Sequence, residues 1–129
     1  MDPLEPELRV IKAAEELAAT LGANDNHTVA AAAMDAHGVI HSAVNLYHFT
    51  GGPCAELVVI GLAASLEAGP LVTMAAAGDR GRGLIAPCGR CRQTMLDMHP
   101  DIVVAVPSTN GPHMAPIQEL LPYSYYAPA

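Results

Sequence analysis

The chain has few basic and few aromatic residues. It contains no tryptophan, one phenylalanine, and six lysines and arginines against thirteen aspartates and glutamates, so its formal net charge is −7. A surface of this sign repels phosphate backbones, which argues against a nucleic-acid duplex as a partner. Only one basic residue, Lys12, is a lysine, and this argues against binding of single strands as well.

Long apolar runs and a secretory leader are also missing. No apolar run reaches the roughly 18–20 residues that a membrane-spanning helix needs, so we expect no membrane partner. Residues 1–5 are acidic and lack the apolar segment of a signal peptide. The cysteines number three, which is odd, and clustered cysteines without a leader indicate metal or redox chemistry rather than disulfides. We therefore expect a reducing, cytoplasmic setting.

The length of 129 residues predicts a single domain over 1–129. Apolar spacing, charge pairs and turn residues predict the elements. They are helices over 4–21, 54–68 and 88–98, a last helical turn over 117–121, and strands over 28–36, 39–44, 71–77, 102–106 and 113–116. The regions 78–87 and 107–112 are expected to be a loop and a turn. Helices that alternate with strands predict a three-layer α/β domain.

Two of these expectations depend on composition. The alanines of 29–36 also suit a helix, but the turn signal His37-Gly38 follows at once and favours a strand. The helix over 54–68 is apolar nearly all round, so we expect it to be fully buried, with cover from another subunit.

The three cysteines fall into two groups, and each group follows a proline and begins a predicted helix. Cys88 and Cys91 are three residues apart, so they share one helical face and can chelate one ion. Cys54 precedes Cys88 by 34 residues, with a strand and a loop between the two helices. Zinc takes thiolate ligands in a tetrahedron, and three protein ligands leave the fourth position for water or substrate.

Glu56 limits where such an ion can lie. Residues two apart do not share a helical face, so Cys54 and Glu56 reach the same ion only over the end of the helix. A carboxylate there can move protons to and from an activated water. The alternatives are a redox Cys-x-x-Cys pair, or a structural zinc site completed by His48 or His99. His99 is better explained as a helix-end residue that meets the helix dipole.

These motifs resemble the cytidine deaminase superfamily. The resemblance is carried by Cys-Ala-Glu at 54–56 and by Pro-Cys-Gly-x-Cys-Arg-Gln at 87–93, which form a zinc-deaminase signature with a glutamate that is not a ligand. Within the superfamily the chain looks like the blasticidin-S deaminases, from about residue 28 onward. The segments that carry this narrower likeness are 45–59, 82–83, 87–93, 96–100 and 119–122.

The resemblance implies a three-layer α/β/α sandwich with a mixed central sheet, and a homotetramer with sites near subunit interfaces. It implies a Zn²⁺ cofactor and hydrolytic deamination of an aminopyrimidine ring, in which activated water attacks the amine-bearing carbon. Glu56 would shuttle protons, and ammonia would leave. The Ala55 amide would bind the ring carbonyl. Substrate-binding positions would be Asn45, Tyr47, Arg82 and Tyr125.

The chain also departs from its relatives. Cytidine deaminases usually carry an arginine after the glutamate, and here Leu57 stands there, so we expect Arg90 to offset the net charge of −1 on a three-thiolate zinc. Cytidine deaminases grip ribose with Asn-x-Glu, whereas this chain has Asn45-Leu46-Tyr47. Against the blasticidin-S deaminases, three further positions differ: His27, Ala31 and Ala127.

These departures leave several functions open. The first is deamination of a cytosine-like small molecule of the blasticidin-S type. The second is deamination of cytidine, deoxycytidine, or a free or modified base such as an amino-triazine. The third is a structural zinc or binding protein without catalysis, which would have no need of Glu56.

Overall fold

A computed structural model describes residues 1–126, and the position of Ala127 lies outside the described residues. The sheet is built from β1 (Val29–Asp35), β2 (Ile40–Val44), β3 (Leu71–Gly78), β4 (Gly83–Ile85), β5 (Val103–Ser108) and β6 (Gly111–Pro116). The helices are α1 (Glu5–Ala19), α2 (Ala55–Ser65), α3 (Gly89–Met98) and the short α4 (Ile117–Leu120). Helices and strands therefore alternate as the sequence predicts.

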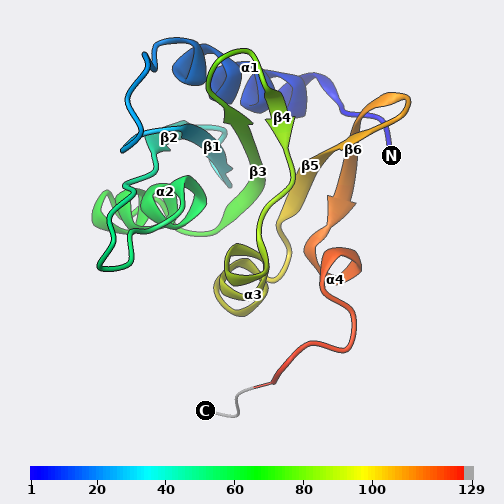
Figure 1. Cartoon of the computed structure of the whole chain (residues 1–129). Helices are drawn as coiled ribbons and strands as arrows, with labels where there is room; N and C mark the ends of the chain where they lie inside the picture. The colour runs from blue at the N-terminus through cyan, green and yellow to red at the C-terminus, as the bar shows by residue number, and fades with distance from the viewer. Residues whose placement is uncertain (127–129) are drawn as a thin grey trace.

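The sheet has the strand order β2-β1-β3-β5-β6, and β4 pairs with the C-terminal end of β3. The β3–β5 pair is parallel, whereas the β1–β2, β1–β3, β3–β4 and β5–β6 pairs are antiparallel. One face of this mixed sheet is covered by α1, and the other carries α2 and α3 (Figure 1). The predicted α/β/α sandwich with a mixed sheet is confirmed.

The strand β1 shows how the sequence builds the core between these layers. Ala30 and Ala32 pack with α1, whereas Ala31 and Ala33 pack with α2, and all four are fully buried. A strand with both faces covered reads as a continuous apolar run rather than an alternating one. The prediction of a strand over a helix is therefore confirmed at 29–35.

The structure differs from the sequence expectations in two segments. The predicted loop 78–87 contains the strand β4, whose Leu84 pairs with Ala77 of β3. The turn predicted over 107–112 is shorter than expected, because β5 extends to Ser108 and β6 begins at Gly111. Both differences have the same cause: short extensions gain hydrogen bonds from a strand that is already in place.

Within one chain the helix α2 is not buried all round, since Leu62 and Leu66 are 38 % and 61 % exposed, and the expected cover from another subunit stays a prediction. His99 lies at the end of α3 as expected, but it does not act as a cation there. Its Nδ1 accepts the amide hydrogen of Leu71 at 3.0 Å, and burial lowers its pKa, so the neutral ring is favoured. None of the helices in the described part of the chain is long and apolar enough to cross a membrane.

Candidate metal centre and active site

The three cysteine sulfurs meet where two helices begin. Cys54 is the N-cap residue of α2, Cys88 is the N-cap of α3, and Cys91 lies in the first turn of α3. The Sγ atoms of Cys54 and Cys88 are 3.6 Å apart, those of Cys88 and Cys91 are 3.5 Å apart, and all three lie within 4.8 Å of one another. The two helix starts thus bring residues 34 positions apart to one point.

The loop before Cys54 is held by a close backbone crossing. The Leu46 amide donates to the Pro53 carbonyl at 3.1 Å, which closes the loop at its base. A Cβ atom on Gly52 would lie 1.6 Å from the Leu46 carbonyl oxygen, so only glycine fits at this position. The crossing fixes the direction in which the chain enters α2, and with it the position of the Cys54 sulfur.

The donor set and its spacing fit a zinc ion. Zn–S bonds of about 2.3 Å in a tetrahedron separate the sulfur ligands by about 3.8 Å, close to the observed separations. A disulfide needs sulfurs about 2.05 Å apart, so the three thiols do not form one here. Three thiolates fill three corners of the tetrahedron and leave the fourth corner for a non-protein ligand.

The electrostatics at the helix starts differ between the thiols. Burial raises the pKa of Cys91, and the nearby charge of Glu56 raises it further. Burial also acts to raise the pKa of Cys88, but hydrogen bonds from the Cys91 and Arg90 amides and from the neighbouring thiols outweigh it, so this pKa is lowered. A bound cation would be needed to hold both sulfurs as thiolates.

Arg90 supplies positive charge at this cluster. Its Nη2 donates to Cys54 Sγ at 3.5 Å and to the Gly52 carbonyl at 3.0 Å. The hydrogen bond to Cys54, together with the charge of the three sulfurs, raises the pKa of Arg90. Arg90 therefore lies where the sequence expects a compensating cation.

Glu56 is a buried carboxyl group next to the sulfurs. It occupies the first turn of α2, two residues after Cys54, and is 4 % exposed. Burial raises its pKa and outweighs the hydrogen bonds from its own amide and from the Cys91 thiol. A carboxyl group with a raised pKa beside a metal site can both accept and return a proton near neutral pH.

A cavity of about 210 Å³ opens on the cluster. Four of its lining residues carry polar or ionisable side chains, namely Cys54, Cys88, Glu56 and Asn45. Its remaining lining residues are Val29, Ala55, Ile85 and Ala86. Mostly apolar walls with a few convergent polar groups are typical of a small-molecule site.

Two of the predicted substrate-binding residues lie at this cavity. Ala55 is the first residue of α2, so its amide hydrogen has no partner within the helix. The Asn45 Oδ1 accepts the amides of Thr28 and Val29 at 2.7 and 3.0 Å, and its Nδ2 donates to Thr28 Oγ1 at 3.3 Å, which fixes the side chain and leaves the second N–H of Nδ2 as the group that can donate to a ligand.

The other three predicted residues do not line the cavity within one chain. Tyr47 is 62 % exposed and Tyr125 is 72 % exposed. Arg82 donates to Asp79 Oδ1 at 2.9 Å and to the Thr28 carbonyl at 2.7 Å. Their contact with substrate stays a prediction.

The apolar walls of the cavity were not predicted from the sequence. Val29 of β1 and Ile85 of β4 both line the cavity, and Ala86 follows β4 directly. Ala86 directly precedes Pro87-Cys88, and this position beside a metal-ligand motif could have identified it as a lining residue. Ile85 had no such signal, because β4 itself was not predicted.

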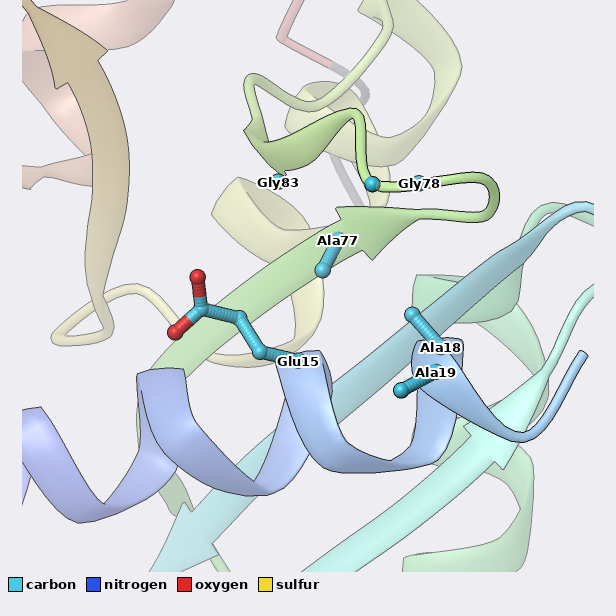
Figure 2. A pocket seen from close by; sticks show the side chains of 7 residues that line it. Glu15, Ala18, Ala19, Ala77, Gly78 and Gly83 are labelled. Carbon is cyan, nitrogen blue, oxygen red and sulfur yellow. The ribbon is translucent and has the colours of Figure 1, made fainter.

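A second cavity of about 190 Å³ lies between the end of α1 and the β3–β4 turn. It is lined by Glu15 together with six alanines and glycines, and Figure 2 shows these small residues around it. No metal-ligating cluster other than the three cysteines is found among residues 1–126. The chemistry of this molecule therefore gathers at the first cavity.

Comparison with known proteins agrees with this site. A family model described as the cytidine and deoxycytidylate deaminase zinc-binding region matches residues 4–106. This chain belongs to that family. The deaminase is 30 % identical to the blasticidin-S deaminase of Bacillus cereus over 94 % of this chain and 93 % of that protein. Zinc as the cofactor and membership of a deaminase family are thus confirmed.

Solved structures share the fold of the deaminase. A mutant cytidine deaminase from Mycobacterium tuberculosis matches with a TM-score of 0.77 at 24 % identity, covering 92 % of this chain and 97 % of that one. A cytidine deaminase from Burkholderia pseudomallei matches with a TM-score of 0.74 at 25 % identity, covering 92 % of this chain and 98 % of that one.

Proposed function

We propose that this protein, as one domain over 1–129, hydrolyses the amine of a cytosine-like aminopyrimidine ring and releases ammonia. The observation that carries the proposal is the position of Glu56: a buried carboxyl group that shares a small, apolar-walled cavity with two sulfurs of the cysteine cluster. A structural zinc site has no use for such a group, since burying a carboxylate without a function only costs stability.

The residues divide the work of the reaction. Cys54, Cys88 and Cys91 would hold the zinc ion, which when bound would supply an activated water of lowered pKa. Glu56 accepts a proton from that water and delivers it to the ring nitrogen, then helps the departing amine to leave as ammonia. Water adds across the carbon–nitrogen double bond, the carbon–amine bond breaks, and the ring keeps the oxygen.

The walls of the cavity position the ring. Val29 and Ile85 offer apolar contacts to a flat ring and exclude bulk water. The free amide hydrogen of Ala55 can donate to a ring carbonyl next to the reacting carbon. Asn45 presents a donor, so we expect it to bind an acceptor oxygen on the group that the ring carries.

Arg90 offsets the charge of the metal site in this proposal. Three thiolates on Zn²⁺ leave a net charge of −1, which makes the activated water less acidic. The positive charge of Arg90, in contact with the Cys54 sulfur, offsets part of that negative charge. The variant Arg90→Ala tests this role.

We further propose a cytoplasmic homotetramer in which neighbouring copies complete the site. Leu62 and Leu66 expose an apolar face on α2 that a second copy can cover. Tyr47 and Tyr125 are exposed and do not line the cavity of their own chain, so they are available to a neighbour, whereas Arg82 is held by Asp79. The mass of the protein in solution, measured by light scattering, checks the assembly.

The substrate is favoured to be of the blasticidin-S type, because the relative named above is a blasticidin-S deaminase and Tyr47 stands where cytidine deaminases grip ribose. The second candidate is a nucleoside or a free or modified base, which the cytidine deaminase neighbours favour by fold. Zinc-loaded protein should be screened for ammonia release from blasticidin S, cytidine, deoxycytidine, cytosine and amino-triazines. Release from none of them would contradict the proposed function.

A further inference from the structure

We propose that Arg92 is a positioning residue of the metal centre and that it joins the turn carrying Cys88 to the C-terminal segment 121–126. Its Nε donates to the Pro87 carbonyl at 2.8 Å, and its Nη1 donates to the Leu120 carbonyl at 2.9 Å. One guanidinium thus holds the residue before a metal ligand and the residue at which α4 ends. The inference rests on the zinc site of the proposed function.

The first contact fixes the peptide group that leads into Cys88. Cys88 is an exposed N-cap residue whose sulfur contacts the neighbouring thiols and the first-turn amides, whereas its backbone is oriented through the peptide group before it. The Pro87 carbonyl belongs to the planar peptide whose nitrogen is that of Cys88, and a hydrogen bond to this carbonyl sets the orientation of the plane. Partners of this kind behind a metal ligand tune metal affinity, and their loss typically weakens binding about 10–100-fold.

The second contact holds the start of a strained segment. The Leu120 carbonyl is one of the last in α4 and lacks a partner within the helix. Three residues later Tyr123 has a φ of 53°, which is costly for a bulky residue, and its side chain is fully exposed. Such a conformation persists only where its flanks are fixed.

Both flanks of Tyr123 are fixed by adjacent residues of α3. Arg92 holds Leu120 on one side, and Gln93 Nε2 donates to the Tyr125 carbonyl at 3.2 Å on the other. These two residues directly follow Cys91 in sequence. The C-terminal segment is therefore fastened to the same helix turn that carries the metal ligands, and Arg92 is the member of the pair that also reaches the Cys88 turn.

The geometry requires an arginine. A guanidinium presents several N–H donors in a rigid plane, so Nε and Nη1 can serve two carbonyls that lie in different directions. A lysine ammonium is a single point on a flexible stem and can keep at most a loose version of one contact. Arg92→Lys therefore keeps the charge while removing the bridge.

The experiment measures zinc release, which does not depend on finding the substrate. Zinc-loaded parent, Arg92→Lys and Gln93→Ala are mixed with a chromogenic chelator, and the rate of zinc transfer is followed. We expect release at least about 10-fold faster from Arg92→Lys, and release within about twofold of the parent from Gln93→Ala, which loses the contacts with Tyr125 and Asp97 but none with the Cys88 turn. Thermal unfolding of the metal-free proteins separates this effect from a general loss of stability.

A truncation tests the joining role. Deleting 122–129 frees the end of α4, and we expect faster zinc release in the parent but no further change in the Arg92→Lys background. The inference is overturned if Arg92→Lys releases zinc at the parent's rate. It is also overturned if the truncation speeds zinc release by the same factor in the parent and in Arg92→Lys, because the two changes then act independently. If Arg92→Lys does not fold, the truncation alone decides, since unchanged zinc release then overturns the joining role. A parent that binds no zinc would instead contradict the proposed function.

Discussion

The helices of this molecule begin in two different ways. At the start of α1, Glu7 Oε1 accepts the Leu4 amide at 2.8 Å, and Glu5 and Glu7 place negative charge in the first turn. None of the N-cap residues Leu4, Cys54 and Cys88 makes a side-chain cap hydrogen bond, but at the starts of α2 and α3 the N-cap side chains are thiols that meet at one point. The first arrangement gives one backbone amide at the helix start an acceptor from the same helix, and the second gathers sulfur atoms there.

The difference shows which helix ends serve stability and which serve chemistry. Free amide hydrogens and the positive end of the helix dipole stabilise an anion. At α1 that anion is a glutamate on the surface. At α3 it is a thiolate, and amide hydrogens from the first turn lower the pKa of Cys88 despite its partial burial. The N-terminal ends of α2 and α3 thus form the metal site, whereas the N-terminal end of α1, on the other face of the sheet, has no part in it.

The largest expected effect comes from replacing one of these cap cysteines. In Cys88→Ser a hydroxyl that stays protonated takes the place of a thiolate ligand, so we expect bound zinc to fall from one per chain to near zero and activity to disappear. Zinc content after gel filtration is the measurement. The matched change at the other kind of helix start is Glu7→Ala, which should cost about 1 kcal/mol of unfolding free energy and leave the zinc content unchanged.

Removing the proton carrier should keep the metal and lose the reaction. Glu56→Gln preserves the size of the buried side chain but cannot take a proton, so we expect kcat to fall about 10²–10⁴-fold with one zinc still bound per chain. Ammonia release and zinc content are measured on the same sample. Full ammonia release by Glu56→Gln would show that the proton path assigned here is wrong.

Arg90 tests whether the charge at the helix starts needs an external partner. In Arg90→Ala the thiolate cluster loses its nearest cation, so the activated water becomes less acidic and the rising limb of the pH–rate profile should move to higher pH. The control is Arg9→Ala, which removes an exposed arginine from α1 and should leave the profile in place. An Arg90→Ala enzyme with unchanged zinc content and an unchanged profile would rule out the role.

Much of this arrangement could be predicted from the sequence because the decisive signals are local. The prolines before Cys54 and Cys88 each mark a helix start, and the spacing of Cys54 and Glu56 predicts an ion over a helix end. The turn at His37-Gly38 identified β1 as a strand although its alanines favour a helix. Each of these inferences uses residues within a few positions of one another, where backbone chemistry alone decides.

The remainder depends on contacts between distant segments or between copies. The three-residue strand β4 exists because β3 offers it hydrogen bonds, and no pattern within 83–85 indicates this. The apolar surface of α2 indicated burial but not its source, and within one chain Leu66 stays exposed. Asp79 binds Arg82 as a local partner, whereas Tyr125 is exposed within one chain.

The far end of α3 gives the smallest effect and extends the comparison from helix starts to a helix end. His99 accepts the Leu71 amide hydrogen through Nδ1 at 3.0 Å, which ties the end of α3 to the start of β3. Only the unprotonated nitrogen can accept, and burial lowers the pKa of His99 from its usual 6.5. This helix end therefore titrates without any metal ligand being involved.

The direction of the pH effect follows from the lowered pKa. At pH 7.5 the ring is neutral in both the folded and the unfolded states, so the contact contributes fully. As the pH falls below about 6.5, the unfolded chain binds a proton that the folded chain resists, and the unfolding free energy decreases until the folded pKa is reached.

His99→Asn keeps an acceptor, Oδ1, at a similar place and does not titrate. Urea unfolding of the metal-free proteins at pH 7.5, 6.0 and 5.0 should show a parent that loses stability relative to His99→Asn as the pH falls, because only in the parent does acid compete with Leu71 for the same nitrogen. A constant difference between the two proteins would mean that the end of α3 is held by packing and not by this hydrogen bond.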